Sequence, residues 1–153
     1  MVIQTRVFGE ITIESSKIIH FENGIIGFPD LQDFALVYDL EKGNDAGIRW
    51  MQSIQEPNFA MPVMDPLLVK PDYNPMVEEE LLKPLGNLVP DETLVLTTVT
   101  VPKDITKMSV NLRGPIIINV TERKAAQIIL EGDEYQVKYP IYEVVKGKKE
   151  GAC

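Results

Sequence analysis

The stretch that decides the fold is Asn111-Leu112-Arg113-Gly114-Pro115-Ile116-Ile117-Ile118-Asn119. At its start, Met108, Val110 and Leu112 alternate with polar side chains, which is the period of a half-buried strand. Gly114-Pro115 then ends that strand, because proline has no N–H to donate and restricts the residue before it. A short aliphatic strand, Ile116 to Ile118, follows at once. Two strands joined at a Gly-Pro corner predict a chain that switches between the sheets of a small barrel.

Strand patterns dominate the rest of the chain. We expect strands over 10–14, 17–21, 34–38, 48–54, 93–101 and 135–139, where apolar residues alternate with polar ones or β-branched residues cluster. Polar turns are expected at Asn23-Gly24 and over 39–47. The segment 59–69 is interrupted by Pro62 and Pro66, which predicts an edge strand or a bulged strand.

Two segments bear on the helix content. Asn74 is a good N-cap and Pro75 suits the first helical position, so one short helix is expected over 76–83, ended by Pro84. The segment 121–130 is ambiguous, because Ala125-Ala126-Gln127 favours a helix while Ile128-Ile129-Leu130 fits a buried strand. We expect a strand there. The predicted fold is therefore all-β, mostly antiparallel and barrel-like, with one short helix.

Length and composition indicate one domain. The chain has 153 residues, 44% of them hydrophobic and 25% charged, and no repeat or low-complexity linker divides it. We place the domain at residues 1–145 and expect residues 146–153, which lack periodicity, to form a flexible basic tail. No basic and apolar leader opens the sequence, and its apolar stretches are too short to cross a bilayer. With its single cysteine at position 153, the chain is expected to be a soluble cytoplasmic protein.

The charge of the chain is strongly negative. Its net charge is −8, and residues 1–145 alone have 12 basic and 22 acidic side chains. Such a charge disfavours direct binding of nucleic acid, because phosphates are neutralised by lysine and arginine. It favours a basic partner, whose approach an acidic surface accelerates. The same charge is equally consistent with a role in solubility alone.

Catalytic patterns are weak throughout the sequence. His20 is the only histidine, lies between Ile19 and Phe21, and is expected to be an ordinary sheet residue. The glycines at 24 and 27 lack the spacing of a phosphate-binding loop. The acidic run 78–80 is typical of a solvated helix face. We therefore predict no catalytic residue, no metal site and no cofactor, although paired carboxylates brought together by the fold stay open.

Two motifs, with shorter matches between them, point to a family. The first is Phe21-Glu22-Asn23-Gly24-Ile25-Ile26-Gly27-Phe28-Pro29-Asp30-Leu31-Gln32-Asp33-Phe34, and the second is the run 111–119 followed by Ala125-x-Gln127-Ile128-Ile129-Leu130. Between them stand Met51-Gln52-Ser53 before Pro57, and Pro66 before Pro71-x-Tyr73. In this order, from Val2 to about Tyr142, the chain resembles the FliW family of flagellar assembly factors.

The resemblance implies a function in binding rather than catalysis. Proteins of this family are non-catalytic factors of the bacterial cytoplasm that bind flagellin before its export, near its terminal helical region. When freed from flagellin, they bind and antagonise CsrA, the small basic regulator that represses translation of flagellin mRNA. The antagonism is described as allosteric. The implied partners are thus flagellin and CsrA, with no direct contact to nucleic acid or membrane.

Site residues follow from this reading in two groups. Gly24 and Gly27 can take positive φ, Phe28-Pro29 can plug one end of a barrel, and asparagines can bind stray backbone groups at the Gly-Pro corner. The expected partner-binding residues are Asp72, Glu78, Glu79, Asn111 and Arg113. The expected structural residues are Gly24, Gly27, Phe28, Pro29, Gly114, Pro115 and Asn119.

The alternative function is a small-ligand-binding β-barrel, or an enzyme that uses clustered carboxylates. A deep apolar pocket with converging carboxylates would support that alternative. A solid barrel interior beside a flat acidic face would support protein binding. A nucleic-acid-binding barrel would need exposed aromatic residues in a basic groove, which this composition disfavours.

Overall fold

The computed structural model describes residues 2–6, 8–37, 48–132 and 134–144. Its one α-helix in these residues is α1 (Glu79–Leu82). The 3₁₀ turns among the described residues are η1 (Ser15–Lys17), η3 (Pro66–Leu68), η4 (Lys83–Leu85), η5 (Pro90–Glu92) and η6 (Ile105–Lys107). The strands are β1 (Val2–Thr5), β2 (Gly9–Thr12), β3 (Ile19–Phe21), β4 (Asp33–Val37), β5 (Ile48–Ser53), β6 (Ala60–Met64), β7 (Thr93–Thr100), β8 (Ser109–Val110), β9 (Ile116–Asn119), β10 (Lys124–Gln127) and β11 (Tyr139–Pro140).

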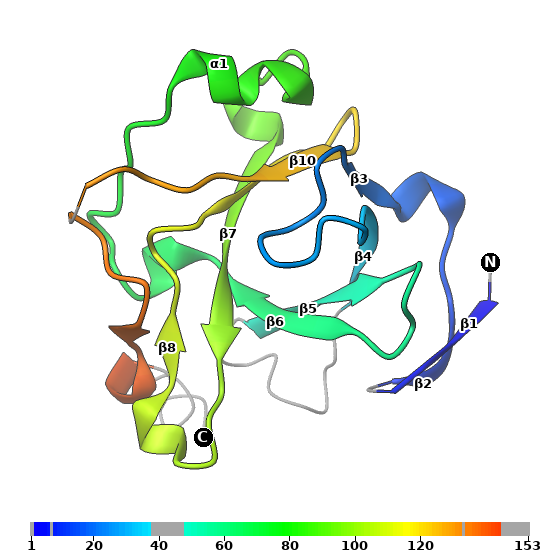
Figure 1. Cartoon of the computed structure of the whole chain (residues 1–153), viewed down its shortest axis with the longest axis horizontal. Helices are drawn as coiled ribbons and strands as arrows, with labels where there is room; N and C mark the ends of the chain where they lie inside the picture. Colours follow the sequence, from blue (N-terminus) through cyan, green and yellow to red (C-terminus); the bar gives the residue numbers. More distant parts are fainter. Residues whose placement is uncertain (1, 7, 38–47, 133, 145–153) are drawn as a thin grey trace.

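Seven of these strands close into a barrel. The order is β7-β6-β5-β4-β3-β10-β9, and β9 pairs again with β7 to complete the ring. All of these pairings are antiparallel except that between β10 and β3. Figure 1 shows the ring of strands, with α1 at one end and the hairpin β1–β2 to the side. The predicted fold class, mostly antiparallel and barrel-like with one short helix, is confirmed.

The Gly-Pro corner divides the partners of one long strand. β7 pairs with β9 through Thr93–Leu96 and with β8 through Val99 and Thr100, so both strands flanking the corner lie along the same edge of β7. β8 then pairs with β11 outside the barrel, whereas β9 belongs to the barrel. Gly114-Pro115 is therefore the point at which the chain passes from the outer strands into the barrel wall.

Two apolar cores lie on the two faces of this wall. The core inside the barrel contains Phe21, Phe34, Met51 and Leu96, with the Phe21 and Phe34 rings 5.3 Å apart. The second core, which we call the outer core, lies between the outside of the wall and the segments that cover it. It includes Leu85, Leu112 and Ile117. Since β7 and β9 alternate between the two cores, both faces of these strands are apolar, as in strands covered on both sides.

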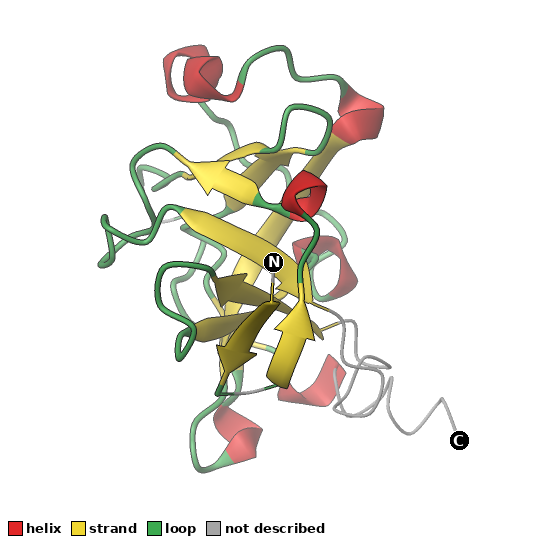
Figure 2. Cartoon of the chain, turned by 90° about the vertical axis from the view of Figure 1, so that its right-hand side faces the viewer, coloured by secondary structure: helices red, strands yellow, loops and turns green. Residues whose placement is uncertain are grey.

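The helix is shorter than the sequence predicts. It begins at Glu79, with Glu78 as N-cap, whereas residues 74–77 are not helical and Asn74 caps nothing. The reason is tertiary, because the Tyr73 hydroxyl donates to the Leu112 carbonyl at 2.6 Å and the Asn74 N–H donates to the Tyr135 hydroxyl at 3.1 Å. These bonds hold the predicted first turn against the wall. Figure 2 shows α1 at one end of the molecule, away from the central strands.

Other expectations about strands need correction. β6 is not an edge strand, because it pairs with β5 over its whole length and with β7 at Val63 and Met64. Pro62 lies outside the short pairing of β6 with β7, so its missing N–H removes no hydrogen bond to β7. The predicted last strand is reduced to β11, and Tyr135 turns into the outer core instead.

The ambiguous segment 121–130 contains a strand, as expected. β10 covers Lys124–Gln127, whose sequence favoured a helix, rather than the isoleucines after it. The strand forms because it bridges β9 and β3 and so closes the ring. Tyr38, the expected turn over 39–47 and the expected tail over 146–153 lie outside the described residues. No helix in the part of the chain that the structure describes is long and apolar enough to cross a membrane.

Candidate functional site

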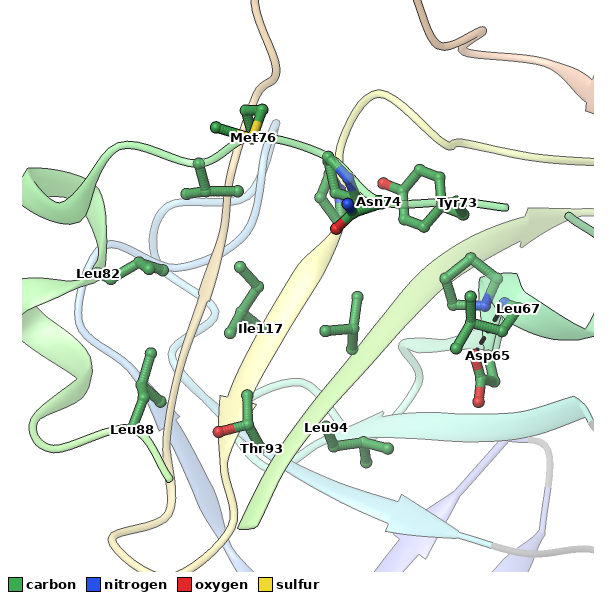
Figure 3. A pocket seen from close by; sticks show the side chains of 15 residues that line it. Asp65, Leu67, Tyr73, Asn74, Met76, Leu82, Leu88, Thr93, Leu94 and Ile117 are labelled. Atoms are coloured by element: carbon green, nitrogen blue, oxygen red, sulfur yellow. Dashed lines mark hydrogen bonds between the residues drawn. The ribbon is translucent and has the colours of Figure 1, made fainter. Parts of the chain in front are cut away.

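An apolar groove of about 590 Å³ lies on the outside of the barrel wall (Figure 3). Its floor is the outer face of β7 and β9, with Val95 and Ile117, and one side is Asp65 to Leu67. Residues 73–88, which we call the strap, pass over the other side. The lining residues are Asp65, Pro66, Leu67, Tyr73, Asn74, Pro75, Met76, Val77, Leu82, Leu88, Thr93, Leu94, Val95, Pro115 and Ile117.

The strap leaves part of the groove open to solvent. Val77, Leu82 and Leu88 pack against the outer core but are only partly buried. Met76 is 90% exposed at the lip of the groove, and Leu67 on the opposite side is 51% exposed. An exposed methionine beside an apolar groove is a feature of adaptable protein-binding surfaces. The groove thus presents apolar side chains that the fold itself does not cover.

One end of the strap is fixed by two tyrosines. The buried rings of Tyr73 and Tyr135 meet edge to face with centroids 4.7 Å apart, and each hydroxyl makes the backbone hydrogen bond described above. Burial, with a smaller contribution from Tyr135, raises the pKa of the Tyr73 hydroxyl above its ordinary value. Tyr73 therefore stays a neutral donor, and the strap starts from a fixed point.

The other end is fixed by Asn119 and Glu122. The Asn119 side chain is buried, and its Nδ2 donates to the Leu85 carbonyl at 2.8 Å and to Glu122 Oε2 at 3.0 Å. The same carboxylate oxygen accepts from the Asn87 N–H at 3.0 Å. Because α1 is only one turn long, these bonds rather than the helix hold the end of the strap.

The surroundings of the groove are acidic. Residues 65–92 contain seven acidic and two basic side chains. Both lysines already have acidic partners, Lys70 with Asp72 at 3.2 Å and Lys83 with Glu80 at 2.9 Å. The hydrogen bond that Lys70 donates to the Asp72 carboxylate, together with the negative charge of that carboxylate, raises the pKa of Lys70. Among the described residues, the ion pairs leave Asp65, Glu78, Glu79, Asp91 and Glu92 without a cationic partner.

The sequence-predicted partner residues lie around this groove without forming one patch. Glu78 and Glu79 are exposed at the start of α1, next to the groove residue Val77. Asp72 is exposed beside Tyr73, and Tyr73 in turn bonds to Leu112 between Asn111 and Arg113. The latter two are half-buried.

The corner residues make local hydrogen bonds. Asn111 Oδ1 accepts from the N–H groups of Arg113 and Gly114, both at 3.0 Å, and Arg113 Nε donates to the Leu130 carbonyl at 3.1 Å. A Cβ at Gly114 would lie 2.9 Å from Asn111 Nδ2, which leaves little room for a side chain. Pro115 lines the groove. Asn119 acts at the strap and not at the corner, where the sequence had placed it.

The first motif forms a loop that lies over the centre of the barrel in Figure 1. Gly24 and Gly27 both have positive φ, of 67° and 87°, as expected. Ile25 packs inside the barrel, whereas Phe28 is 47% exposed and its ring lies tilted against that of Phe59, with centroids 4.8 Å apart. The expectation that Phe28 plugs the barrel is wrong, because Ile25 is the residue of this loop that is buried in the inner core.

The single histidine and the acidic side chains of the described residues can be examined for catalytic geometry. His20 Nδ1 lies 2.8 Å from Asp33 Oδ1, and Asp33 Oδ2 accepts from Gln55 at 2.6 Å, which makes an exposed, hydrogen-bonded histidine. Within the described residues no three His, Cys, Asp or Glu side chains are placed to hold a metal ion. Of the described residues lining the groove, Asp65 is the one carboxylate, and it accepts from the Leu67 N–H at 2.9 Å. The groove therefore lacks the converging carboxylates that an acid-base enzyme would need.

The apolar lining of the groove was not found from the sequence. Met76, Val77 and Leu82 fell within the helix expected over 76–83, which in the structure begins only at Glu79. No local signal in residues 73–88 indicates the groove, since its lining combines this segment with residues that are distant in the sequence.

Comparisons with known proteins agree on one family. The family model described as FliW protein matches residues 2–141. A flagellar assembly factor FliW of Lachnospira eligens is 49% identical over 95% of this chain and 97% of its own length, and one of Lachnoclostridium phytofermentans is 42% identical over the full length of both chains. A crystal structure of the flagellar assembly factor FliW superposes with a TM-score of 0.83 at 28% identity, covering 92% of this chain and 96% of that one.

Proposed function

This chain belongs to the FliW family of flagellar assembly factors, and from that membership we propose that it binds flagellin in the bacterial cytoplasm before export. When flagellin has been exported, the freed protein binds CsrA and antagonises it. Translation of flagellin mRNA then resumes. In this role the protein acts by binding alone and catalyses no reaction.

The observation that supports this proposal most strongly is the extent of the family match. It covers residues 2–141, and relatives named flagellar assembly factor FliW align with nearly all of the chain. Both sequence motifs lie within that match, and so do all seven strands of the barrel.

The surface supports the same proposal physically. The inside of the barrel is filled by its own core, so the space for partners is on the outside. There the strap combines an apolar groove with unpaired carboxylates. Apolar side chains supply affinity and acidic ones accelerate the approach of a basic partner, which fits a regulator that binds RNA phosphates.

The experiment is isothermal titration of the purified protein with CsrA and, separately, with flagellin, at low and moderate salt. We expect binding of both partners, with weaker binding of CsrA as salt rises. Reversing the charge of Glu78 and Glu79 (E78K and E79K together) should weaken CsrA binding and flatten its salt dependence, since these exposed residues make no described ion pair. Lys substitution of Glu10 and Glu14, exposed and outside the groove lining, is the matched control. Absence of binding to both partners would refute the proposed function.

A further inference from the structure

We propose that the groove beneath the strap is the binding site for a basic amphipathic helix of a partner protein. The helix would place apolar side chains in the groove and lysine or arginine side chains against the acidic strap. The inference rests on the proposed function, because it assigns partner binding to one surface and specifies the chemistry of the segment bound. It adds the residues that touch the partner and the helical form of the segment bound.

The shape of the groove indicates what kind of segment can enter it. Strand addition needs a free strand edge, but β7 pairs with β9 over Thr93–Leu96, and η3 packs beside β7 near the groove. What remains accessible is the outer face of the wall, with Val95 and Ile117 on the floor. A helix that lays one apolar face into a hydrophobic groove suits this arrangement. The volume of about 590 Å³ lies within the usual range of binding sites, about 300–1,000 Å³.

The groove is preformed, which lowers the entropy that binding must overcome. Tyr73 and Asn119 fix the two ends of the strap through buried hydrogen bonds. Pro66, Pro75 and Pro115 stand in the groove wall, where their fixed φ limits backbone motion. A rigid site does not have to be ordered when a partner arrives, so more of the contact energy appears as affinity.

Charge decides which helix is bound. The carboxylates of Glu78 and Glu79 follow the groove residue Val77 directly, and Asp91 and Glu92 precede Thr93 on the floor. Both lysines of residues 65–92 are occupied by acidic neighbours. An acidic helix would therefore be repelled, whereas a basic helix would find complementary charges beside the groove.

The probe is a synthetic 18-residue peptide of leucine and lysine with helical amphipathic spacing. Two control peptides have the same length: one replaces every lysine with glutamate, and the other scrambles the order so that no apolar face forms. Binding to the full chain is followed by backbone amide NMR shifts. We expect shifts concentrated at Met76, Val77, Leu82, Leu88 and Ile117, and affinity at least tenfold lower for both control peptides. Shifts centred elsewhere, or equal binding of the glutamate peptide, would overturn the inference.

A matched pair of variants makes the test specific. Met76→Lys places a cation at a side chain that is 90% exposed, so the fold should tolerate it. Val101→Lys is the control, because Val101 is 53% exposed and does not line the groove. We expect M76K to lower affinity for the lysine peptide by about tenfold, the effect of losing one buried apolar contact, and V101K to leave it unchanged. Equal affinities of the two variants would refute the inference.

The same variants separate this inference from the proposed function. If the wild-type protein binds flagellin and CsrA but M76K binds both as tightly, the groove is not the partner's seat and the proposed function stands. If the wild-type protein binds the lysine peptide in the groove but neither flagellin nor CsrA, the groove is a helix-binding site and the proposed function fails. If M76K weakens both the peptide and one of the two proteins, the inference is supported and that protein is the partner seated there.

Discussion

Removing the Asn119 side chain should release the far end of the strap and destabilise the whole domain. Asn119 is 2% exposed, and in Asn119→Ala the bonds from its Nδ2 to the Leu85 carbonyl and to Glu122 are lost. Each such bond contributes about 1 kcal/mol, and a buried carbonyl left unsatisfied costs about 1–3 kcal/mol more. Leu85 is itself buried, so water cannot readily replace the hydrogen bond that its carbonyl loses. We expect a loss of about 3 kcal/mol in the free energy of unfolding.

Urea unfolding measures this loss directly. With a slope of about 2 kcal/mol per molar urea, the midpoint should fall by roughly 1.5 M while the slope stays unchanged. Asn58→Ala is the matched control, because Asn58 is exposed and its side chain makes no described hydrogen bond, and it should change stability by less than about 0.5 kcal/mol.

A second substitution at the same position tests the direction of the bonds. Asn119→Asp keeps the shape but replaces a donor with a carboxylate that faces the Leu85 carbonyl and Glu122. It should be at least as damaging as alanine at pH 7, and less damaging at acidic pH where a protonated carboxyl can donate. A loss below about 1 kcal/mol for N119A would refute the assignment of Asn119 as the anchor of the strap.

Three further predictions concern the loop and the tyrosine anchor. Gly24→Ala should destabilise the protein more than Gly27→Ala, because both have positive φ but only a Cβ at Gly24 meets the Pro29 backbone, at 2.5 Å; equal losses in thermal unfolding would contradict this. Tyr73→Phe should lower stability by about 1–2 kcal/mol in urea unfolding, because it removes the donor to the Leu112 carbonyl; an unchanged midpoint would show that this bond does not stabilise the strap. Because the pKa of Tyr73 is raised on folding, its contribution is complete below pH 10 and is lost as pH rises further, so the wild type should lose stability above pH 10 and Tyr73→Phe should reduce that slope.

The barrel was predictable from the sequence because local signals and tertiary contacts agree. The β-branched run that became β7 pairs with three strands, and the Gly114-Pro115 corner separates two of them. Where local sequence signals and tertiary contacts disagreed, the tertiary contacts determined the structure. Asn74 is a residue type that favours the N-cap position, but its N–H donates to the Tyr135 hydroxyl. The segment of β10 contains residues that favour a helix, but it forms the strand that closes the ring. Propensity alone could not reveal either outcome.

The candidate site was predictable only in part. The acidic start of α1 is visible as a run of glutamates, and Tyr73 stands in the family motif. The groove itself joins residues from the strap, η3, β7 and β9, and its lining extends from Asp65 to Ile117, which are 52 positions apart in the sequence. Its openness depends on how far the strap stands from the wall, which the buried bonds of Tyr73 and Asn119 determine. A sequence pattern does not reveal which distant residues meet at the groove, nor how far the strap stands from the wall.

The central claim is that this protein relieves CsrA repression when flagellin does not occupy it. The most direct measurement is the release of a labelled flagellin mRNA leader from CsrA, followed by fluorescence anisotropy as this protein is added. The account predicts that the free protein releases the RNA and that the same protein preloaded with flagellin does not. RNA that stays bound to CsrA at every concentration of the free protein would contradict the account.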